Sequence, residues 1–543
     1  LSRGLGDVYK RQFHILSDMA FWNPAEIIGS NPRPLDYSLY RELITAHIWS
    51  AGLQPLGYQP VRGELMQKVG NKPYISVNYT FDGLTPAGLP EDLCYKLNQY
   101  YEQKLRQDKT AHDKIEFEII FNTYDFMTDT RLKELAEYGF DDVEISQLRN
   151  ALFEIAKQTL EHYDEICEED LRSLGQLTEL RHELRKHSPL AETNVMKLYS
   201  YIDELLDSIK DHGTPQFTRQ ARCAFMARSF CRTLVEKGYF TKQEMDDFML
   251  SIPTVASEFE RDFDLYSHGK LSRDDFNHLY GHLRLGTYDI RSDSYRNIYF
   301  DVASANLTGN NKVKQEAKSL DLERLQVALD EAGIPVTPEK FIEFIKKATQ
   351  NREYFKFEFT KSLSLMLDVI VKLGEVMAIA REDMSYLEIQ DLLSYHSRDS
   401  YIQTIETRRR FYHVNSYLVL PEVIFDVGDI DVIDIDEARP NFITNKVVEA
   451  PIVNLDEDHD SDITGKIVVL TKADPGYDWI FAKDIAGFVT KYGGAASHMA
   501  IRCAEFGIPA AIGCGEKIYQ RIHRMQIMCL DCENGRITEK QSQ

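Results

Sequence analysis

The sequence predicts a multi-domain protein in which a large, mainly α-helical domain with a small β element precedes a C-terminal α/β domain. From about 90 to 410, apolar residues recur at the three- and four-residue spacing of amphipathic helices. Before this region, residues 72–81 alternate apolar and polar side chains between Gly70 and Gly83, which is typical of a strand or hairpin. After it, 487–515 reads as a strand, a glycine turn and a helical run.

Composition divides the chain into four segments. Residues 1–12, LSRGLGDVYKRQ, do not begin with Met and do not join naturally to the sequence from residue 13 onward, so we interpret them as a non-native leader on an N-terminally truncated fragment. We assign 13–410 to the helical domain. Residues 411–463 are predicted to be a strand-rich linker region, because the first half is rich in Val, Ile and Tyr. Residues 464–543 form the predicted α/β domain.

Charge and hydropathy limit the classes of partner. The net charge of −23 disfavours nucleic acid and anionic membranes, so any anion site must be local. The longest apolar helix candidate, 363–379, is interrupted by Asp368, Lys372 and Glu375 and is therefore predicted to be a core helix. Eight scattered cysteines without a secretory signal favour a cytoplasmic location.

Two features resemble metal sites only superficially. The acidic segment NLDEDHDSD, 454–462, could hold a cation, but adjacent carboxylates without a shaped loop favour a solvated turn. Cys529 and Cys532 form a single Cys-x-x-Cys in a predicted strand and turn, which is weak evidence for zinc or redox chemistry. No metal site is predicted.

The glycine pair Gly493–Gly494 is followed by Ser497 and His498, which open the helical run. The first backbone N–H groups of a helix lack intrahelical partners and carry partial positive charge, so an anion beside His498 would be held there. A neutral imidazole is also a competent nucleophile near pH 7. The turn therefore suits a phosphorylated histidine, with a simple helix-capping histidine as the alternative.

The whole block resembles the swivelling phosphohistidine domain of the phosphoenolpyruvate-utilising enzymes, which include phosphoenolpyruvate synthase, pyruvate phosphate dikinase and rifampicin phosphotransferase. The resemblance covers about 80 residues, with GKIVVL (465–470) as the opening strand and MCLDCENGRI (528–537) as the closing hairpin. It implies that His498 is the catalytic phosphate carrier. The motif residues are Thr490, Gly493, Gly494, Ser497, His498, Ala500, Ile501, Gly507, Ile508, Pro509 and Ala510.

The chain departs from the family pattern at two positions. Ala496 and Ala504 stand where the family usually has Thr and Arg, so regulation by phosphorylation of that threonine is not expected. Arg502, four residues after His498, lies on the same helical face and could take over a phosphate contact. The predicted phosphate-binding residues are Gly493, Gly494, Ser497 and Arg502.

Three upstream segments resemble the acceptor-binding domain of the same enzymes. In YGHLRLGTYDI, 280–290, the matching positions are His282, Arg284, Tyr288 and Asp289, which are predicted to bind the acceptor. The alternative is a helix-ending turn whose polar groups satisfy one another. The aromatics of 17–40 are interpreted as packing, and Arg352, Lys356 and Lys361 of the third segment as mostly surface charges.

The resemblance implies a dikinase-like phosphotransferase. No ATP-grasp domain is recognised in this chain, so ATP and Mg²⁺ are expected to bind such a domain upstream in cis or on another chain in trans. His498 would then carry the phosphoryl group to a small-molecule acceptor in the helical domain. The alternatives are a phosphohistidine carrier or regulatory protein without acceptor chemistry, a phosphoenolpyruvate synthase-like enzyme, and a binding scaffold with a vestigial histidine.

Overall fold

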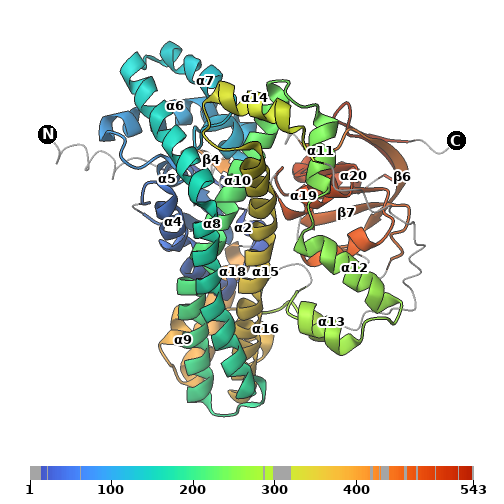
Figure 1. Cartoon of the computed structure of the whole chain (residues 1–543). Helices are drawn as coiled ribbons and strands as arrows, with labels where there is room; N and C mark the ends of the chain where they lie inside the picture. Colours follow the sequence, from blue (N-terminus) through green and yellow to red (C-terminus); the bar gives the residue numbers. More distant parts are fainter. Residues whose placement is uncertain are drawn as a thin grey trace.

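The structure is a computed structural model in which a helical domain lies beside a C-terminal sheet domain (Figure 1). The predicted leader, residues 1–12, lies outside the described residues. The structure describes 14–540 except for 21–22, 62, 285–287, 298–318, 416–419, 427–428, 430–439, 458–460, 473–474, 496 and 524.

Four long helices form the centre of the helical domain: α8 (Asp142–Lys186), α9 (Val195–His212), α10 (Thr214–Glu236) and α15 (Pro338–Val376). Helix α15 packs against the other three. Its side chains Leu363, Met366 and Ile370 are fully buried in one large apolar core. The segment predicted to be a core helix is one, although α15 ends at Val376. Within the described residues, no helix combines the length and apolarity needed to cross a bilayer.

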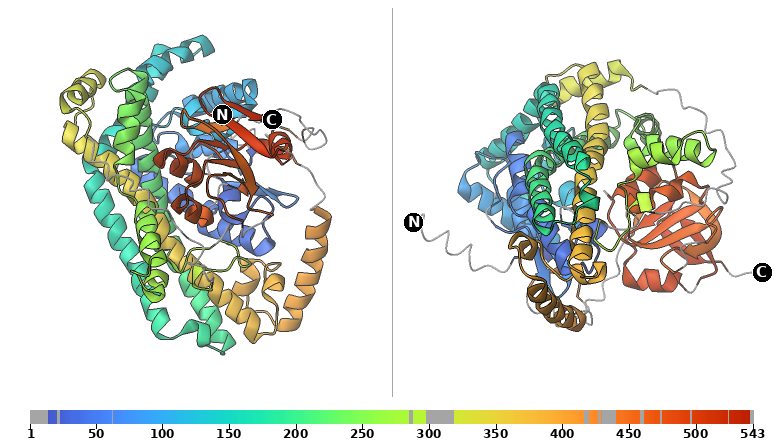
Figure 2. Two further views of the ribbon diagram at one scale, coloured as in Figure 1. Left: turned by 90° about the vertical axis from the view of Figure 1, so that its right-hand side faces the viewer. Right: turned by 90° about the horizontal axis from the view of Figure 1, so that it is seen from below.

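Shorter helices surround this centre (Figure 2). The α-helices are α2 (Pro24–Ile28), α3 (Pro34–Tyr40), α4 (Ile48–Leu53), α5 (Val77–Leu84), α6 (Glu91–Gln107), α7 (Thr128–Arg131), α11 (Lys242–Leu250), α12 (Val255–Ser267), α13 (Arg273–Tyr280), α14 (Leu322–Ala332), α16 (Arg381–Met384), α17 (Ile389–Leu393) and α18 (Arg398–Asn415). Two 3₁₀ segments reach the site described below: η7 (Tyr295–Asn297) and η10 (Pro475–Ala482).

A small antiparallel sheet accompanies the helices, in the order β2-β3-β1-β4. Its strands are β1 (Leu16–Ser17), β2 (Met66–Val69), β3 (Lys72–Ser76) and β4 (Val423–Ile424). The strand predicted over 72–81 is therefore wrong in its second half. Ser76 ends the strand because its hydroxyl accepts a hydrogen bond from Tyr79 N–H and caps α5.

The C-terminal domain contains a seven-stranded sheet in the order β11-β10-β6-β7-β8-β9-β5. Strands β6 to β9 pair in parallel, and the outer pairs are antiparallel. The elements are β5 (Asn441–Ile443), β6 (Val447–Asn454), β7 (Ile467–Lys472), β8 (Gly487–Tyr492), α19 (His498–Glu505), β9 (Ala510–Ile512), α20 (Gly515–Ile522), β10 (Ile527–Asp531) and β11 (Arg536–Glu539).

The two helices of this domain cover opposite faces of the sheet. Successive side chains of a strand point to opposite faces, so Val468 and Leu470 share a core with α19, while Ile467 and Val469 share a core with α20. The predicted fold class is confirmed. The sheet nevertheless begins at β5, inside the segment predicted to be a linker, because β5 and β6 complete its hydrogen bonding.

Candidate functional site

The glycine turn after β8 fixes the position of His498. Gly493 has a φ of 136°, a conformation that favours glycine. A Cβ atom on Gly513 would lie 2.2 Å from the Gly493 carbonyl oxygen, so the two loops need this close approach. Ser497 caps α19, since its Oγ accepts a 3.2 Å hydrogen bond from Ala500 N–H. His498 is therefore the first residue of α19, as predicted from the sequence.

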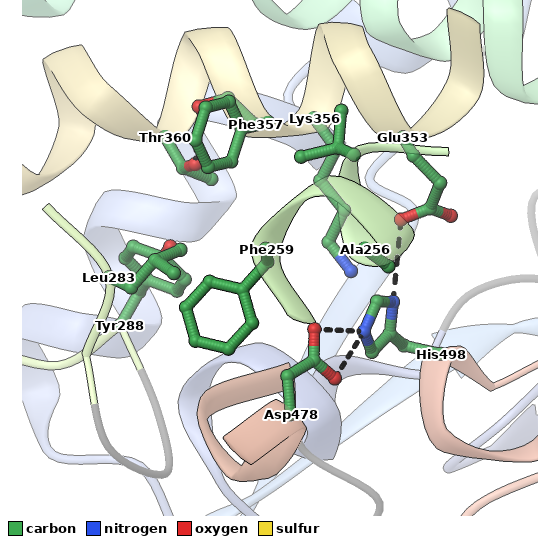
Figure 3. A pocket seen from close by; sticks show the side chains of 11 residues that line it. Ala256, Phe259, Leu283, Tyr288, Glu353, Lys356, Phe357, Thr360, Asp478 and His498 are labelled. Carbon is green, nitrogen blue, oxygen red and sulfur yellow. Dashed lines mark hydrogen bonds and ion pairs between the residues drawn. The ribbon is translucent and has the colours of Figure 1, made fainter. Parts of the chain in front are cut away.

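The His498 ring is clamped between two carboxylates (Figure 3). Its Nε2 lies 2.7 and 2.9 Å from the two carboxylate oxygens of Asp478, which belongs to η10 of the same domain. Its Nδ1 lies 3.4 Å from Oε2 of Glu353, which belongs to α15 of the helical domain. Only 5% of His498 is exposed. The histidine thus lies at the contact between the two domains.

Both carboxylates favour the imidazolium form. Burial alone would lower the pKa of His498, but the Asp478 and Glu353 carboxylates outweigh it and raise the pKa to about 9. Burial likewise opposes ionisation of Glu353, yet His498, Arg352 and Lys356 hold its pKa well below the ordinary value. In this arrangement the ring nitrogens act as donors, so His498 is not a nucleophile until it leaves the clamp.

This clamp predicts a pH-dependent stability. Because the pKa of His498 is raised from 6.5 to about 9, the clamp should stabilise the fold fully below pH 6.5 and lose its effect as the pH rises through 9. The shift corresponds to about 3 kcal/mol. We expect wild-type protein to be more stable than His498→Asn near pH 6, and the unfolding curves of the two proteins to converge near pH 10. A constant difference across that range would contradict the clamp.

A cavity opens beside His498 between the two domains, with an interior volume of about 50 Å³. That is room for a few water molecules, so a larger acceptor requires the domains to separate. Lys356 points from α15 toward the His498 ring (Figure 3) and forms no ion pair with the described residues. The wall consists of Val255, Ala256, Phe259, Leu283, Tyr288, Glu353, Lys356, Phe357, Thr360, Asp478 and His498.

Arg502 lies one turn along α19 from His498 and is 2% exposed. Its Nη1 donates a 3.0 Å hydrogen bond to Glu505, and its Nε and Nη2 lie 3.8 Å from Asp478 and Glu260, respectively. Neither Nε nor Nη2 donates a hydrogen bond to a described atom. Two buried N–H donors of the Arg502 guanidinium thus lie close to Asp478, the residue that contacts His498, without a hydrogen bond of their own. Such donors are compatible with the predicted contact to a phosphate.

The segment predicted to bind the acceptor reaches the cavity only in part. Tyr288 lines it, whereas Arg284 is fully buried and donates to Asp368 Oδ1 at 2.6 Å. Asp289 accepts from the backbone N–H groups of Arg291 and Ser292. The contacts of Asp289 match the alternative of a turn whose polar groups satisfy one another, whereas Arg284 is held by Asp368 of α15. The acceptor-binding roles of these residues and of His282 stay predictions.

The interpretation of Lys356 as a surface charge is wrong, because Lys356 lies in the cavity wall with Glu353 of the same helix. Sequence reasoning named Lys356 only as a surface charge and missed Glu353. A signal was present, since Glu353, Phe357 and Thr360 recur at the spacing of one helical face.

Residues 463–535 match the family described as "PEP-utilising enzyme, mobile domain". The C-terminal domain is therefore a mobile domain of the phosphoenolpyruvate-utilising enzymes, which confirms the resemblance seen in the sequence.

Two similar relatives are both named rifampicin phosphotransferase. The protein of Bacillus subtilis (strain 168) is 28% identical over 222 residues, 37% of this chain and 24% of the relative. The protein of Bacillus cereus is 26% identical over 212 residues, 35% of this chain and 24% of the relative. The matched part of the chain thus spans about a quarter of the length of each relative.

Proposed function

We propose that this chain is part of a phosphotransferase in which His498 carries a phosphoryl group to an acceptor bound between the mobile domain and α15. The observation that carries the proposal is the position of His498: it starts a helix of a mobile domain and faces Glu353 and Lys356 of the helical domain. A carrier histidine has to meet the acceptor site, and this contact supports such a meeting.

The donor side is assigned to another domain. In the described part of the chain, no three or more His, Cys, Asp or Glu side chains are grouped so that they could hold a metal ion. We assign ATP and Mg²⁺ to an ATP-grasp domain, in cis upstream or in trans. To accept a phosphoryl group there, His498 must leave Glu353, which removes one of the charges that raise its pKa.

On the acceptor side, phosphoryl transfer breaks the P–N bond of phosphohistidine and forms a P–O bond to an acceptor hydroxyl. The phosphoryl group in transfer carries negative charge, which Lys356 in the cavity wall is placed to neutralise. Arg502 Nε and Nη2, which donate no hydrogen bond to a described atom, could add to this only if they exchange their carboxylate neighbours for phosphate oxygens. The imidazole nitrogen keeps the electron pair of the broken bond. The hydroxyl proton passes through Glu353 to that nitrogen, which gives a neutral imidazole. Uptake of a second proton from solvent, which the two carboxylates favour, then gives the imidazolium held between Asp478 and Glu353.

Phosphorylation reverses the charge complementarity of the domain contact. The clamp holds an imidazolium between carboxylates, whereas a phosphohistidine would place negative charge against Glu353 and Asp478. The arrangement therefore corresponds to the discharged carrier. The carrier without acceptor chemistry is the second candidate, but Lys356 in the cavity wall beside His498 favours transfer to a bound acceptor.

The test is to supply an ATP-grasp donor domain with ATP labelled at the β-phosphate and, separately, at the γ-phosphate. Acid-labile, base-stable label on His498 from the β-phosphate would support the dikinase route. If neither the β-labelled nor the γ-labelled ATP gives label on His498, ATP is not the source of the phosphoryl group. Label that never leaves His498 for any hydroxyl compound would favour the carrier.

A further inference from the structure

A second group of basic side chains, here called the basic cluster, surrounds His282. It consists of Arg181 and Arg185 on α8, Lys361 on α15 and Arg296 in η7. The cluster lies beside the cavity of His498, because Phe357 lines that cavity and also contacts the His282 ring, with the ring centroids 4.6 Å apart.

Positive charge in the basic cluster is not balanced by the described residues. Arg181 and Lys361 share one carboxylate, Glu358, at 3.0 and 2.5 Å. Arg185 and Arg296 form no ion pair with any residue that the structure describes. The cluster therefore contains two arginines whose guanidinium groups are available to an external anion.

Asp368 and Arg284 lie next to the basic cluster, but as one anion and one cation they leave its net positive charge unchanged. The Asp368 carboxylate, like that of Glu358, interacts electrostatically with Arg185. Asp368 also forms a 2.6 Å ion pair with a further cation, Arg284. Five cations thus face two carboxylates. Unpaired positive charge beside a partly apolar wall is costly unless an anion compensates it.

His282 provides an independent sign of a missing ligand. The residue is 5% exposed, and its buried Nε2 has no hydrogen-bond partner in the described part of the chain. Burial and the surrounding cations hold the pKa of His282 well below its usual value, so the ring is neutral. A neutral imidazole protonated at Nε2 can donate to a ligand oxygen, whereas leaving a buried polar atom unpaired is unfavourable.

We propose that the basic cluster binds an oxyanion, a carboxylate or phosphate group, of the molecule that accepts the phosphoryl group. Arg185 and Arg296 make the charged contacts, and His282 Nε2 donates to a third oxygen. An acceptor that lies along Phe357 would then place its hydroxyl group at His498 and its anionic group at the cluster. The role in acceptor binding rests on the proposed function, but oxyanion binding itself does not.

Calorimetric titration with inorganic phosphate at low ionic strength tests the binding site directly. We expect Arg185→Gln and Arg296→Gln each to weaken phosphate binding on the order of tenfold. Arg296 is exposed, so its replacement leaves the core intact. The matched control is Arg172→Gln, an exposed position on α8 about 20 Å from Arg185 along the helix, which should bind phosphate like wild type.

The same titration with His498→Asn separates this proposal from the proposed function. Unchanged phosphate binding in His498→Asn, together with the loss in Arg185→Gln, would support the basic cluster even if His498 proves never to be phosphorylated. The proposal is overturned if wild-type protein binds no phosphate, if the Arg185 and Arg172 variants behave alike, or if His498→Asn abolishes binding.

Discussion

Replacing His498 with Asn should remove the acid-labile, base-stable label that the protein takes from phosphoramidate, a direct chemical phosphoryl donor. Asn is neutral, cannot be phosphorylated in this way and can still hydrogen-bond to Asp478, which contacts His498 Nε2 at 2.7 Å. The fold around α19 should therefore survive while the carrier is lost. Label is measured by mass spectrometry of peptides kept at alkaline pH.

The control is His162→Asn on α8, because the His162 side chain is 56% exposed and His498 is buried. If reactivity followed exposure alone, His162 would be labelled first. We expect the reverse, since undocking brings out a histidine at a helix N-terminus that stabilises a bound phosphoryl group. Glu353→Gln should increase the label on His498 by loosening the clamp. Equal labelling of the two histidine variants would rule out a special role for His498.

Much of the fold could be predicted because the spacing of apolar residues along the chain shows which face of a helix or strand is buried. The core helix around Leu363 and the strand and helix that flank Gly493 follow from local patterns that the tertiary structure does not override. Position 77 shows the opposite case. The alternation of apolar and polar residues over 72–81 fits a strand throughout. The chain nevertheless turns into α5 after Ser76, because the Ser76 hydroxyl caps that helix. A pattern of hydrophobic residues does not reveal a single side-chain hydrogen bond of this kind.

The candidate site could be predicted only within its own motif. His498 and Ser497 are adjacent in sequence, so the motif already contains their geometry. Glu353 lies 145 residues earlier in the chain than His498 and meets it only because the two domains dock. Arg284 shows the opposite error. It is predicted to bind the acceptor because its segment resembles the family, but inside the fold it forms an ion pair with Asp368. Partners across a domain contact cannot be read from spacing along the chain.

Lys356→Met should leave the labelling of His498 intact and slow the transfer from phosphorylated His498 to an acceptor by roughly 10²–10³-fold, about 3–4 kcal/mol in the barrier. Lys356 lines the cavity beside His498, and its charge acts on the carboxylates of Glu353 and Glu26 without a direct ion pair among the described residues. Its charge is therefore available when negative charge moves from the histidine toward the acceptor oxygen. Methionine keeps a similar unbranched length and removes only the ammonium group.

The readout is the decay of label on His498 after a hydroxyl compound that discharges the wild-type protein is added. The matched control is Lys347→Met on the same helix, where the lysine is 41% exposed and pairs with Asp164 and Glu343 on the surface. Loss of such a surface pair costs about 0–1 kcal/mol of stability and should not change the decay. If both lysine variants discharge at the wild-type rate, the cavity beside Lys356 is not where transfer occurs, and the acceptor must meet His498 after the mobile domain has left α15.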